Sequence, residues 1–269
     1  MSIRSRCLTS FTLAKQKIKN LLRPAPNNSG PREGRNLIMT AGDAVGRVML
    51  EQTMDLMQAY ALRIGADFKL LQAENHTKYS LPRPHAVKFY CGLELKHYDR
   101  VFWIDADCLV SPRCPDIFSH VPSQYSFAAW CDEPRAFDPD EEISRPAYRH
   151  GYFNSGVLLA SDPRPFARGL QILQNSDTLL NDHEKQIIMG EQTPFNKAVH
   201  DLNIPVFPLA PEWNFLLHPV TRARLGIQTP LENAYIVHCA GSSHLEVADP
   251  RCRQSRSVGL KSLREKLGW

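Results

Sequence analysis

Two carboxylates, two residues apart, follow an apolar segment in the middle of the chain. Residues 100–104 read Arg-Val-Phe-Trp-Ile, and Asp105 and Asp107 come directly after them, separated by Ala106. Such residues favour a buried strand, and side chains at positions i and i+2 of extended backbone point to the same face. Two neighbouring carboxylates repel each other unless a cation lies between them, and their hard oxygens select Mg²⁺ or Mn²⁺. The pair therefore predicts a divalent metal site, and a polar strand end in an Asx turn is the alternative interpretation.

The segments around this pair predict an α/β fold. Apolar residues recur every three or four positions over residues 48–62, which indicates an amphipathic helix that ends at Gly65. Strands are expected at 36–40, 68–71, 100–104, 125–130, 155–160, 204–209 and 234–238, with further helices at 85–97, 164–174 and 191–201. This alternation is typical of a Rossmann-like, mainly parallel central sheet flanked by helices. Ligands of such sheets bind beyond the carboxyl ends of the strands, which is where the aspartate pair is expected.

Composition excludes several classes of protein. The chain has 269 residues, of which 43% are hydrophobic and 22% are charged, so it is neither collagen-like nor wholly disordered. No apolar run approaches the ~18 residues that a membrane-spanning helix needs. The seven cysteines form no Cys-x-x-Cys pair, which argues against a thiolate zinc site and favours a reducing compartment. We therefore expect a cytoplasmic protein.

The positive charge lies at the two ends of the chain. Residues 1–35 hold eight Lys or Arg and one acidic residue, residues 251–269 hold six and one, and the net charge of the whole chain is +4. We expect a basic N-terminal segment and linker over 1–35, one folded domain over 36–250 and a basic C-terminal tail over 251–269. A nucleic-acid-binding protein would carry its positive charge on the folded body, so no nucleic-acid partner is expected. The basic ends predict peripheral contact with anionic membrane, and solvated, frayed ends are the alternative.

Two classes of metal-using enzyme place an Asp-x-Asp pair at a strand end. Phosphatases of the haloacid dehalogenase type use the first Asp as a nucleophile and need a later Lys and an acidic pair on a Gly-Asp loop. No convincing match to those features follows residue 190, and Cys108 and Leu109 replace the Gly and the Thr or Val that usually follow the pair. Nucleotide-sugar transferases use the pair to hold the metal that bridges the diphosphate. A non-catalytic module that binds nucleotide sugars is a third interpretation.

Three further segments decide between these classes. They are Tyr-Phe-Asn-Ser-Gly at 152–156, Glu-Gln-Thr-Pro-Phe-Asn at 191–196 and Tyr-Ile-Val-His-Cys-Ala-Gly at 235–241. Together with Asp105 and Asp107, and in this order, they resemble glycosyltransferase family 8 over about residues 36–245. The resemblance implies a GT-A fold and transfer of a hexose, with retention of anomeric configuration, from a nucleotide sugar. A UDP-sugar donor and a glycan, glycolipid or protein acceptor are what it implies as substrates.

The resemblance also assigns roles to single positions. Asp105, Asp107 and His238 match the ligands of Mn²⁺ or Mg²⁺. The positions that match the family's contacts with the donor nucleotide are Thr40, Ala41, Asp43, Lys88, Asp105, Ala106, Asp107, Gly241 and His244. The positions that match the lining of the sugar near its anomeric carbon are Asn154, Glu191 and Gln192.

Three positions depart from the family's pattern. His244 stands where the family has a Lys that neutralises the leaving diphosphate, and an imidazole with a pKa near ~6.5 supplies that charge only in part at neutral pH. Val45 stands where an aromatic residue stacks on uracil, and Glu191 stands where the family usually has Asp. The identity of the base is therefore less firmly implied than the metal.

Overall fold

The computed structural model describes residues 34–42, 46–72, 84–132, 148–186, 190–217, 228–240 and 253–269. Within these ranges, none of the helices combines the length and the apolar composition that crossing a bilayer would require.

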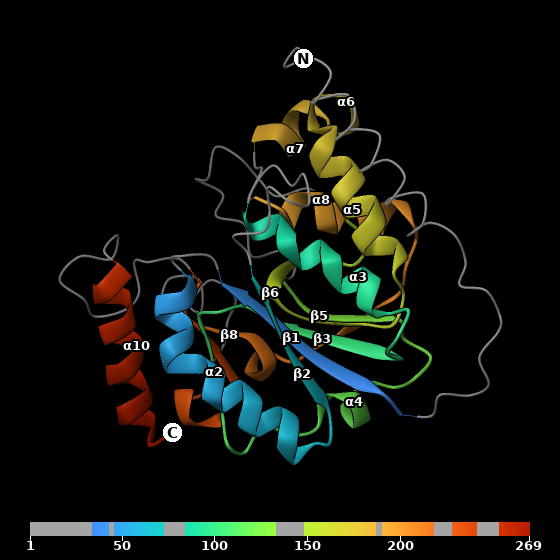
Figure 1. The fold of residues 1–269 in the computed structure, drawn as a ribbon. Helices are drawn as coiled ribbons and strands as arrows, with labels where there is room; N and C mark the ends of the chain where they lie inside the picture. Colours follow the sequence, from blue (N-terminus) through green and yellow to red (C-terminus); the bar gives the residue numbers. More distant parts are fainter. Residues whose placement is uncertain are drawn as a thin grey trace, which may run out of the picture.

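A six-stranded sheet forms the centre of the molecule (Figure 1). Its strands, in spatial order, are β2 (Asp67–Gln72), β1 (Asn36–Gly42), β3 (Arg100–Ile104), β6 (Tyr152–Ala160), β5 (Phe127–Asp132) and β7 (Val206–Pro208). β1 is parallel to β2 and β3, and β7 is parallel to β5, whereas β6 runs antiparallel to both of its neighbours. The mainly parallel α/β sheet expected from the sequence is thus confirmed, with β6 as the strand that reverses direction.

A second, smaller sheet continues from the end of β3. It contains β4 (Cys108–Val110), β9 (Ile236–His238) and β8 (Phe215–Leu216), in that order. β4 pairs antiparallel with β9, so that Cys108 lies directly opposite His238, and β8 pairs parallel with β9. Strands this short show no alternation that a sequence pattern could detect, and β4 and β8 were not expected. Their pairing brings the end of β9 beside the residues that follow β3.

Helices cover both faces of the central sheet (Figure 1). α2 (Gly46–Arg63) and the short α4 (Ile117–His120) lie on one side, and α3 (Cys91–Glu94), α5 (Arg164–Gln174) and α8 (Gln192–Asp201) lie on the other. The remaining helical elements are η2 (Pro84–Tyr90), α6 (Ser176–Leu179), α7 (Asp182–Gln186), η4 (Pro211–Asn214), η5 (Leu231–Asn233) and α10 (Arg253–Leu267). The helix expected at 85–97 is instead the 3₁₀ helix η2 followed by a single turn of α-helix.

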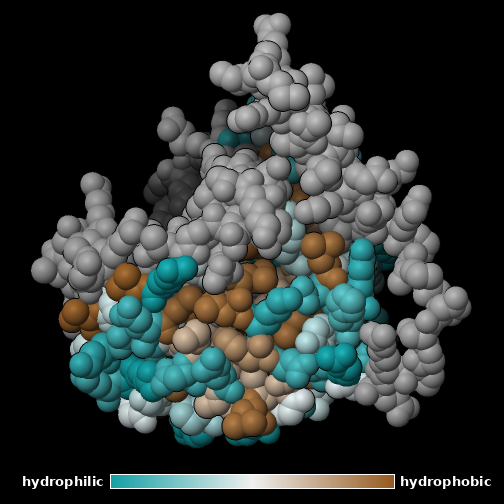
Figure 2. All heavy atoms as spheres, viewed as in Figure 1, coloured by the Kyte–Doolittle hydropathy of each residue, from teal (hydrophilic) through white to brown (hydrophobic). Residues whose placement is uncertain are grey.

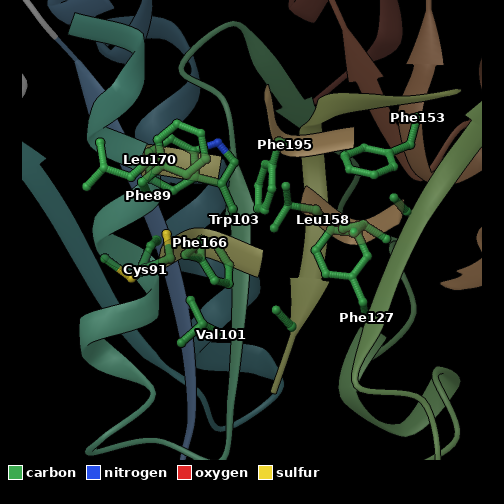
Figure 3. Close-up of a cluster of buried hydrophobic side chains, with 14 of the residues drawn as sticks. Phe89, Cys91, Val101, Trp103, Phe127, Phe153, Leu158, Phe166, Leu170 and Phe195 are labelled. Atoms are coloured by element: carbon green, nitrogen blue, oxygen red, sulfur yellow. The ribbon is translucent and has the colours of Figure 1, made fainter. Parts of the chain in front are cut away.

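The two faces of β3 anchor two hydrophobic clusters. Val101 and Trp103 point to the side of α5 and α8, and Figure 3 shows Trp103 beside Phe89 and Phe195. Phe102 and Ile104, the alternate residues of the strand, pack on the side of α2. All these side chains are almost fully buried, and burial of each contributes roughly 1.5–3 kcal/mol relative to exposure. β3 is therefore held on both faces up to the residue before Asp105.

The C-terminal segment, expected as a basic tail, contains helix α10, which lies beside α2 (Figure 1). The guanidinium of Arg264 binds both carboxylate oxygens of Asp55 at 2.9 and 2.6 Å, and Leu260 is fully buried. Figure 2 shows this side of the molecule, where hydrophobic and hydrophilic side chains are interspersed. Among the described residues, Leu62, Leu70 and Val258 are the large hydrophobic side chains with high exposure.

Candidate active site

Backbone hydrogen bonds fix the chain at the point where it leaves β3. The Asp105 amide donates to the carbonyl oxygen of Gly156 at 2.8 Å, and the Cys108 amide donates to the Asp105 carbonyl oxygen at 3.1 Å. The Cys239 amide donates to the Asp107 carbonyl oxygen at 3.0 Å. β6 therefore holds the first residue of the aspartate pair, and the chain that follows β9 holds the second.

Asp105 belongs to a group that we call the lysine cluster, made of Lys88, Asp105, Ser155 and Glu191. Lys88 Nζ lies 2.6 Å from Glu191 Oε1 and 3.2 Å from Asp105 Oδ1, and it donates to Ser155 O and Oγ, each at 3.1 Å. The Trp103 indole Nε1 donates to Asp105 Oδ1 at 2.6 Å. Burial disfavours the Lys88 ammonium, but the carboxylates of Asp105 and Glu191 outweigh that penalty and raise its pKa. Lys88 is therefore a buried cation that holds two carboxylates.

Asp107 belongs to a second group, the histidine cluster, made of Asp107, Asn154, Asn214 and His238. His238 Nε2 lies 3.4 Å from Asp107 Oδ1, and His238 Nδ1 lies 2.8 Å from Asn214 Oδ1. Asn214 Nδ2 donates to Asn154 Oδ1 at 3.1 Å. His238 is buried, and its ring contacts the backbone of β6 at Gly156, where a Cβ would lie only 2.1 Å from His238 Cε1. A glycine at position 156 is thus what lets the imidazole reach Asp107.

The histidine cluster has the donor set of a divalent metal site. Ligand atoms of Asp107, Cys108 and His238 all lie within 4.8 Å of one another, and a carboxylate with an imidazole suits Mn²⁺. Burial, and then the charge of Asp107, raise the pKa of the Cys108 thiol well above its usual value, so the protonated sulfur is a poor ligand for a hard cation. The residues present therefore fit the expected metal. The carboxylate of Asp105 lies instead against Lys88 and Trp103.

The three residues expected around the anomeric carbon come together at the junction of β6 and α8. Gln192 Oε1 accepts from the Ser155 amide at 3.2 Å, and Asn154 Oδ1 accepts from the Gly156 amide at 2.9 Å. Glu191, the N-cap residue of α8, is the carboxylate bound by Lys88. Asn154 thus belongs to the histidine cluster and Glu191 to the lysine cluster, and Gln192 contacts Ser155 of the lysine cluster.

The expected nucleotide contacts are only partly described. Thr40 and Ala41 lie in β1 shortly before its last residue, Gly42, and the Thr40 hydroxyl is fully buried without a hydrogen-bond partner among the described residues. The Ala106 carbonyl oxygen accepts from Thr53 Oγ1 of α2 at 2.8 Å. Asp43, Val45, Gly241 and His244 lie outside the described residues. The interpretation of His244 as a stand-in for the family's Lys therefore stays a prediction.

Two residues of the site carried no signal strong enough to be singled out. Ser155 lies within the segment 152–156 that supported the resemblance, but nothing in that segment indicated its contacts with Lys88 and Glu191. Asn214 follows Trp213 in η4 and is fully buried. Its partner His238 lies 24 residues further along the chain, so only the pairing of β8 with β9 reveals the contact.

Comparison with known proteins agrees with this architecture. The model of the family "Glycosyl transferase family 8" matches residues 53–243. A glycosyltransferase involved in glycosylation of the major capsid of PBCV-1 superimposes with a TM-score of 0.53 at 16% identity, over 85% of this chain and 100% of its own. GlyE of Streptococcus pneumoniae TIGR4 gives a TM-score of 0.53 at 17% identity, over 87% of this chain and 64% of its own.

A third solved structure, the bifunctional glycosyltransferase WbbM, gives a TM-score of 0.54 at 12% identity, over 89% of this chain and 52% of its own. At such low identities these likenesses concern the fold alone, and no curated protein sequence matches the chain. The family match covers most of the chain, including Asp105, Asp107 and His238. The chain belongs to glycosyl transferase family 8 and is a glycosyltransferase with the GT-A fold.

Proposed function

We propose that this glycosyltransferase moves a hexose from a nucleotide sugar to a glycan, glycolipid or protein acceptor, with retention at the anomeric carbon. A UDP-sugar is the main candidate donor. The observation that supports this most directly is the approach of His238 Nε2 to Asp107 Oδ1, at 3.4 Å, beside the buried cation Lys88. A site for a diphosphate donor needs positive charge, and a carboxylate–imidazole pair recruits it as a divalent ion.

The proposed metal site uses Asp107 and His238, and the resemblance adds Asp105 as a further ligand. When bound there, Mn²⁺ or Mg²⁺ supplies Lewis-acid stabilisation of the negative charge that develops on the leaving diphosphate. Gly156 keeps the His238 ring against β6, and Asn214 binds its other nitrogen. These contacts hold the imidazole in one orientation before any ligand arrives, which reduces the free energy spent on ordering the site.

The lysine cluster is proposed to position the donor sugar. Lys88 Nζ, 2.6 Å from Glu191 Oε1, holds this carboxylate at the junction of β6 and α8. There the Glu191 oxygens accept hydrogen bonds from sugar hydroxyls, and the amide groups of Gln192 and Asn154 border the same junction. In this proposal the sugar lies beside the lysine cluster and the diphosphate lies beside the histidine cluster.

A binding and turnover screen tests the proposal. The protein is incubated with nucleoside diphosphates and their sugars, with and without Mn²⁺, and the unfolding temperature and the release of free nucleoside diphosphate are measured. We expect a UDP-sugar to raise the unfolding temperature only when Mn²⁺ is present, and Asp107→Asn to abolish that rise. Release of phosphate from a generic aryl phosphate, with no response to any nucleotide sugar, would instead support the phosphatase interpretation.

We also propose that the protein is cytoplasmic and contacts anionic membrane peripherally through its basic ends. In the described part of α10, the side chains of Lys261 and Lys266 are exposed, and Val258 presents an exposed apolar surface. Each Lys near an anionic surface contributes roughly 1 kcal/mol. Co-sedimentation with anionic vesicles should weaken as salt rises and should weaken further in the double variant Lys261→Gln/Lys266→Gln. Equal binding to neutral vesicles would contradict an electrostatic attachment.

A further inference from the structure

Asn214 links two residues of the candidate site that lie far apart in sequence. It is the last residue of η4, directly before β8, and it is fully buried. The carboxamide contacts Asn154 through Nδ2, at 3.1 Å, and His238 through Oδ1, at 2.8 Å. A buried amide with both ends engaged has one orientation that satisfies its partners, and here the partners determine which one it is.

Gly156, Asn154, Asn214 and His238 are joined by successive hydrogen bonds, and the direction of each bond follows from the backbone amide of Gly156. The amide of Gly156 can only donate, so the Asn154 side-chain atom 2.9 Å from it is the carbonyl oxygen. That oxygen accepts a second hydrogen bond, which must come from the NH₂ group of Asn214. The Asn214 oxygen therefore faces His238 Nδ1 and, because a carbonyl oxygen only accepts, Nδ1 must carry the proton.

The other ring nitrogen then has a defined role. A neutral imidazole carries one proton, and with that proton on Nδ1 the lone pair of Nε2 lies towards Asp107 Oδ1, 3.4 Å away. The contact between the ring and Gly156 limits rotation that would exchange the two nitrogens. Two acceptors that face each other at this distance are an arrangement that a cation between them stabilises.

From this geometry we infer that Asn214 is a positioning residue that fixes the His238 proton on Nδ1 and so presents Nε2 as a metal ligand. The inference rests on the metal site of the proposed function but concerns a residue that touches neither the metal nor the donor. The backbone amide of Gly156 in β6 sets the orientation of the Asn154 side chain, Asn154 sets that of Asn214, and Asn214 sets the position of the proton on the imidazole. Partners of this kind typically change metal affinity ~10–100-fold when they are removed.

The first measurement reads the tautomer directly in metal-free protein. A long-range ¹⁵N–¹H correlation spectrum shows which imidazole nitrogen carries the proton, and the signals of His238 are those missing from the spectrum of His238→Gln. We expect the wild type to have the proton on Nδ1. A proton on Nε2 overturns the inference whatever the variants do. Because this readout needs neither metal nor donor, it stands apart from the proposed function, which fails instead if the wild type binds no Mn²⁺.

The second measurement compares two variants at position 214 by titration with Mn²⁺, followed by electron paramagnetic resonance. Asn214→Leu removes the acceptor at similar volume and should weaken Mn²⁺ binding ~10–100-fold. It should also populate both tautomers. Asn214→Asp keeps an oxygen for Nδ1–H but loses the donor to Asn154 Oδ1, so it should retain the wild-type tautomer and bind Mn²⁺ more tightly than Asn214→Leu.

A matched control separates positioning from general loss of a buried hydrogen bond. Tyr148 is buried, and its hydroxyl donates to Glu184 Oε1 at 2.8 Å, between elements that hold neither cluster. Tyr148→Phe should lower the unfolding temperature but leave Mn²⁺ affinity and the His238 tautomer unchanged. If Asn214→Leu keeps both the tautomer and the Mn²⁺ affinity, or if Tyr148→Phe loses affinity to the same extent, Asn214 is structural only. If Asn214→Leu does not fold, the wild-type and Asn214→Asp spectra decide.

Discussion

The lysine cluster and the histidine cluster each take one aspartate from the turn that follows β3, but the surroundings of the two aspartates differ. Asp105 meets a protein cation, Lys88, and an indole N–H, both within the hydrogen-bonded range. Asp107 meets an imidazole nitrogen at 3.4 Å, supported from behind by Asn214. Lys88 also binds Glu191, so the lysine cluster carries its own countercharge.

An Asp-x-Asp pair therefore need not act as one symmetric metal clamp. In this chain the first aspartate is joined through Lys88 to Ser155 and Glu191, and the second faces the histidine. A buried cation is a fixed part of the fold, whereas a divalent ion can arrive and leave with the donor. The lysine cluster is therefore expected to matter most for stability, and the histidine cluster for metal affinity.

The largest expected effect comes from Lys88→Met, which leaves Asp105 and Glu191 without their common cation. Breaking a buried ion pair by removing one partner costs about 3–5 kcal/mol, and urea unfolding at neutral pH measures this loss of free energy of unfolding. Lys69→Met is the matched control, because Lys69 pairs with Glu94 at 2.7 Å but its side chain is 43% exposed. That control should lose no more than ~1 kcal/mol. Similar losses in both variants would show that Lys88 is no more than a surface-type ion pair.

A smaller effect separates the two aspartates. Asp107→Asn should weaken Mn²⁺ binding at least ~100-fold, or about 2.7 kcal/mol, because it removes a charged ligand that faces His238. Asp105→Asn should weaken it by about tenfold, since its carboxylate is shared with Lys88 and Trp103. Both constants can be measured by Mn²⁺ titration without nucleotide. Equal losses would show that the two aspartates act as one symmetric metal clamp.

A third effect uses a histidine that serves neither cluster. His150 Nε2 donates to Asn196 Oδ1 at 3.3 Å, because a carbonyl oxygen only accepts, and the Asn196 amide also pairs with the backbone of Phe153 in β6. Burial lowers the pKa of His150 from 6.5 to about 4. The unfolded chain therefore binds more protons between these values, so the stabilisation is complete above about pH 6.5 and is lost as the pH falls towards 4.

We expect roughly 2 kcal/mol of stability to disappear across that window, less than the full shift implies because the ring keeps some contact with solvent. Denaturant unfolding at several pH values measures the loss in the metal-free protein. His150→Gln should flatten the profile, whereas His97→Gln, at an exposed position, should not. A profile for His150→Gln that retains the wild-type slope would assign the acid sensitivity to another group.

Much of the scaffold could be predicted from the sequence, because its signals are local. The strand that leads to Asp105 is an uninterrupted apolar run, and α2 has an apolar face at helical spacing, so each element is indicated by its own residues. The placement of β6 between β3 and β5 has no local signal in the sequence. The two-residue strand β8 and the three-residue strand β4 have none either. Their pairing depends on tertiary contacts that no period in the sequence records.

Some contacts of the candidate site could likewise be predicted from the sequence, and others could not. Asp107 and His238 were expected together from the resemblance, and the structure brings them to 3.4 Å. The attachment of Asp105 to Trp103 could not be expected, because residues two apart on a strand share a face but their side-chain hydrogen bonds depend on rotamers. Ser155 and Asn214 act through partners 67 and 24 residues away, and only the assembled sheets show them.

The contact of α10 with α2 has a consequence for the order of folding. Leu260 completes the hydrophobic cluster that also contains Met49, Leu109, Phe215 and Val237, and this cluster supports β4, β8 and β9. Arg264 binds Asp55 across 209 positions of sequence, so α10 emerges from the ribosome after every strand that it covers. At a synthesis rate of ~5–20 residues per second, the six-stranded sheet has time to form before the small sheet receives its last covering helix. The strand that carries His238 therefore receives its covering helix only after the central sheet has been synthesised.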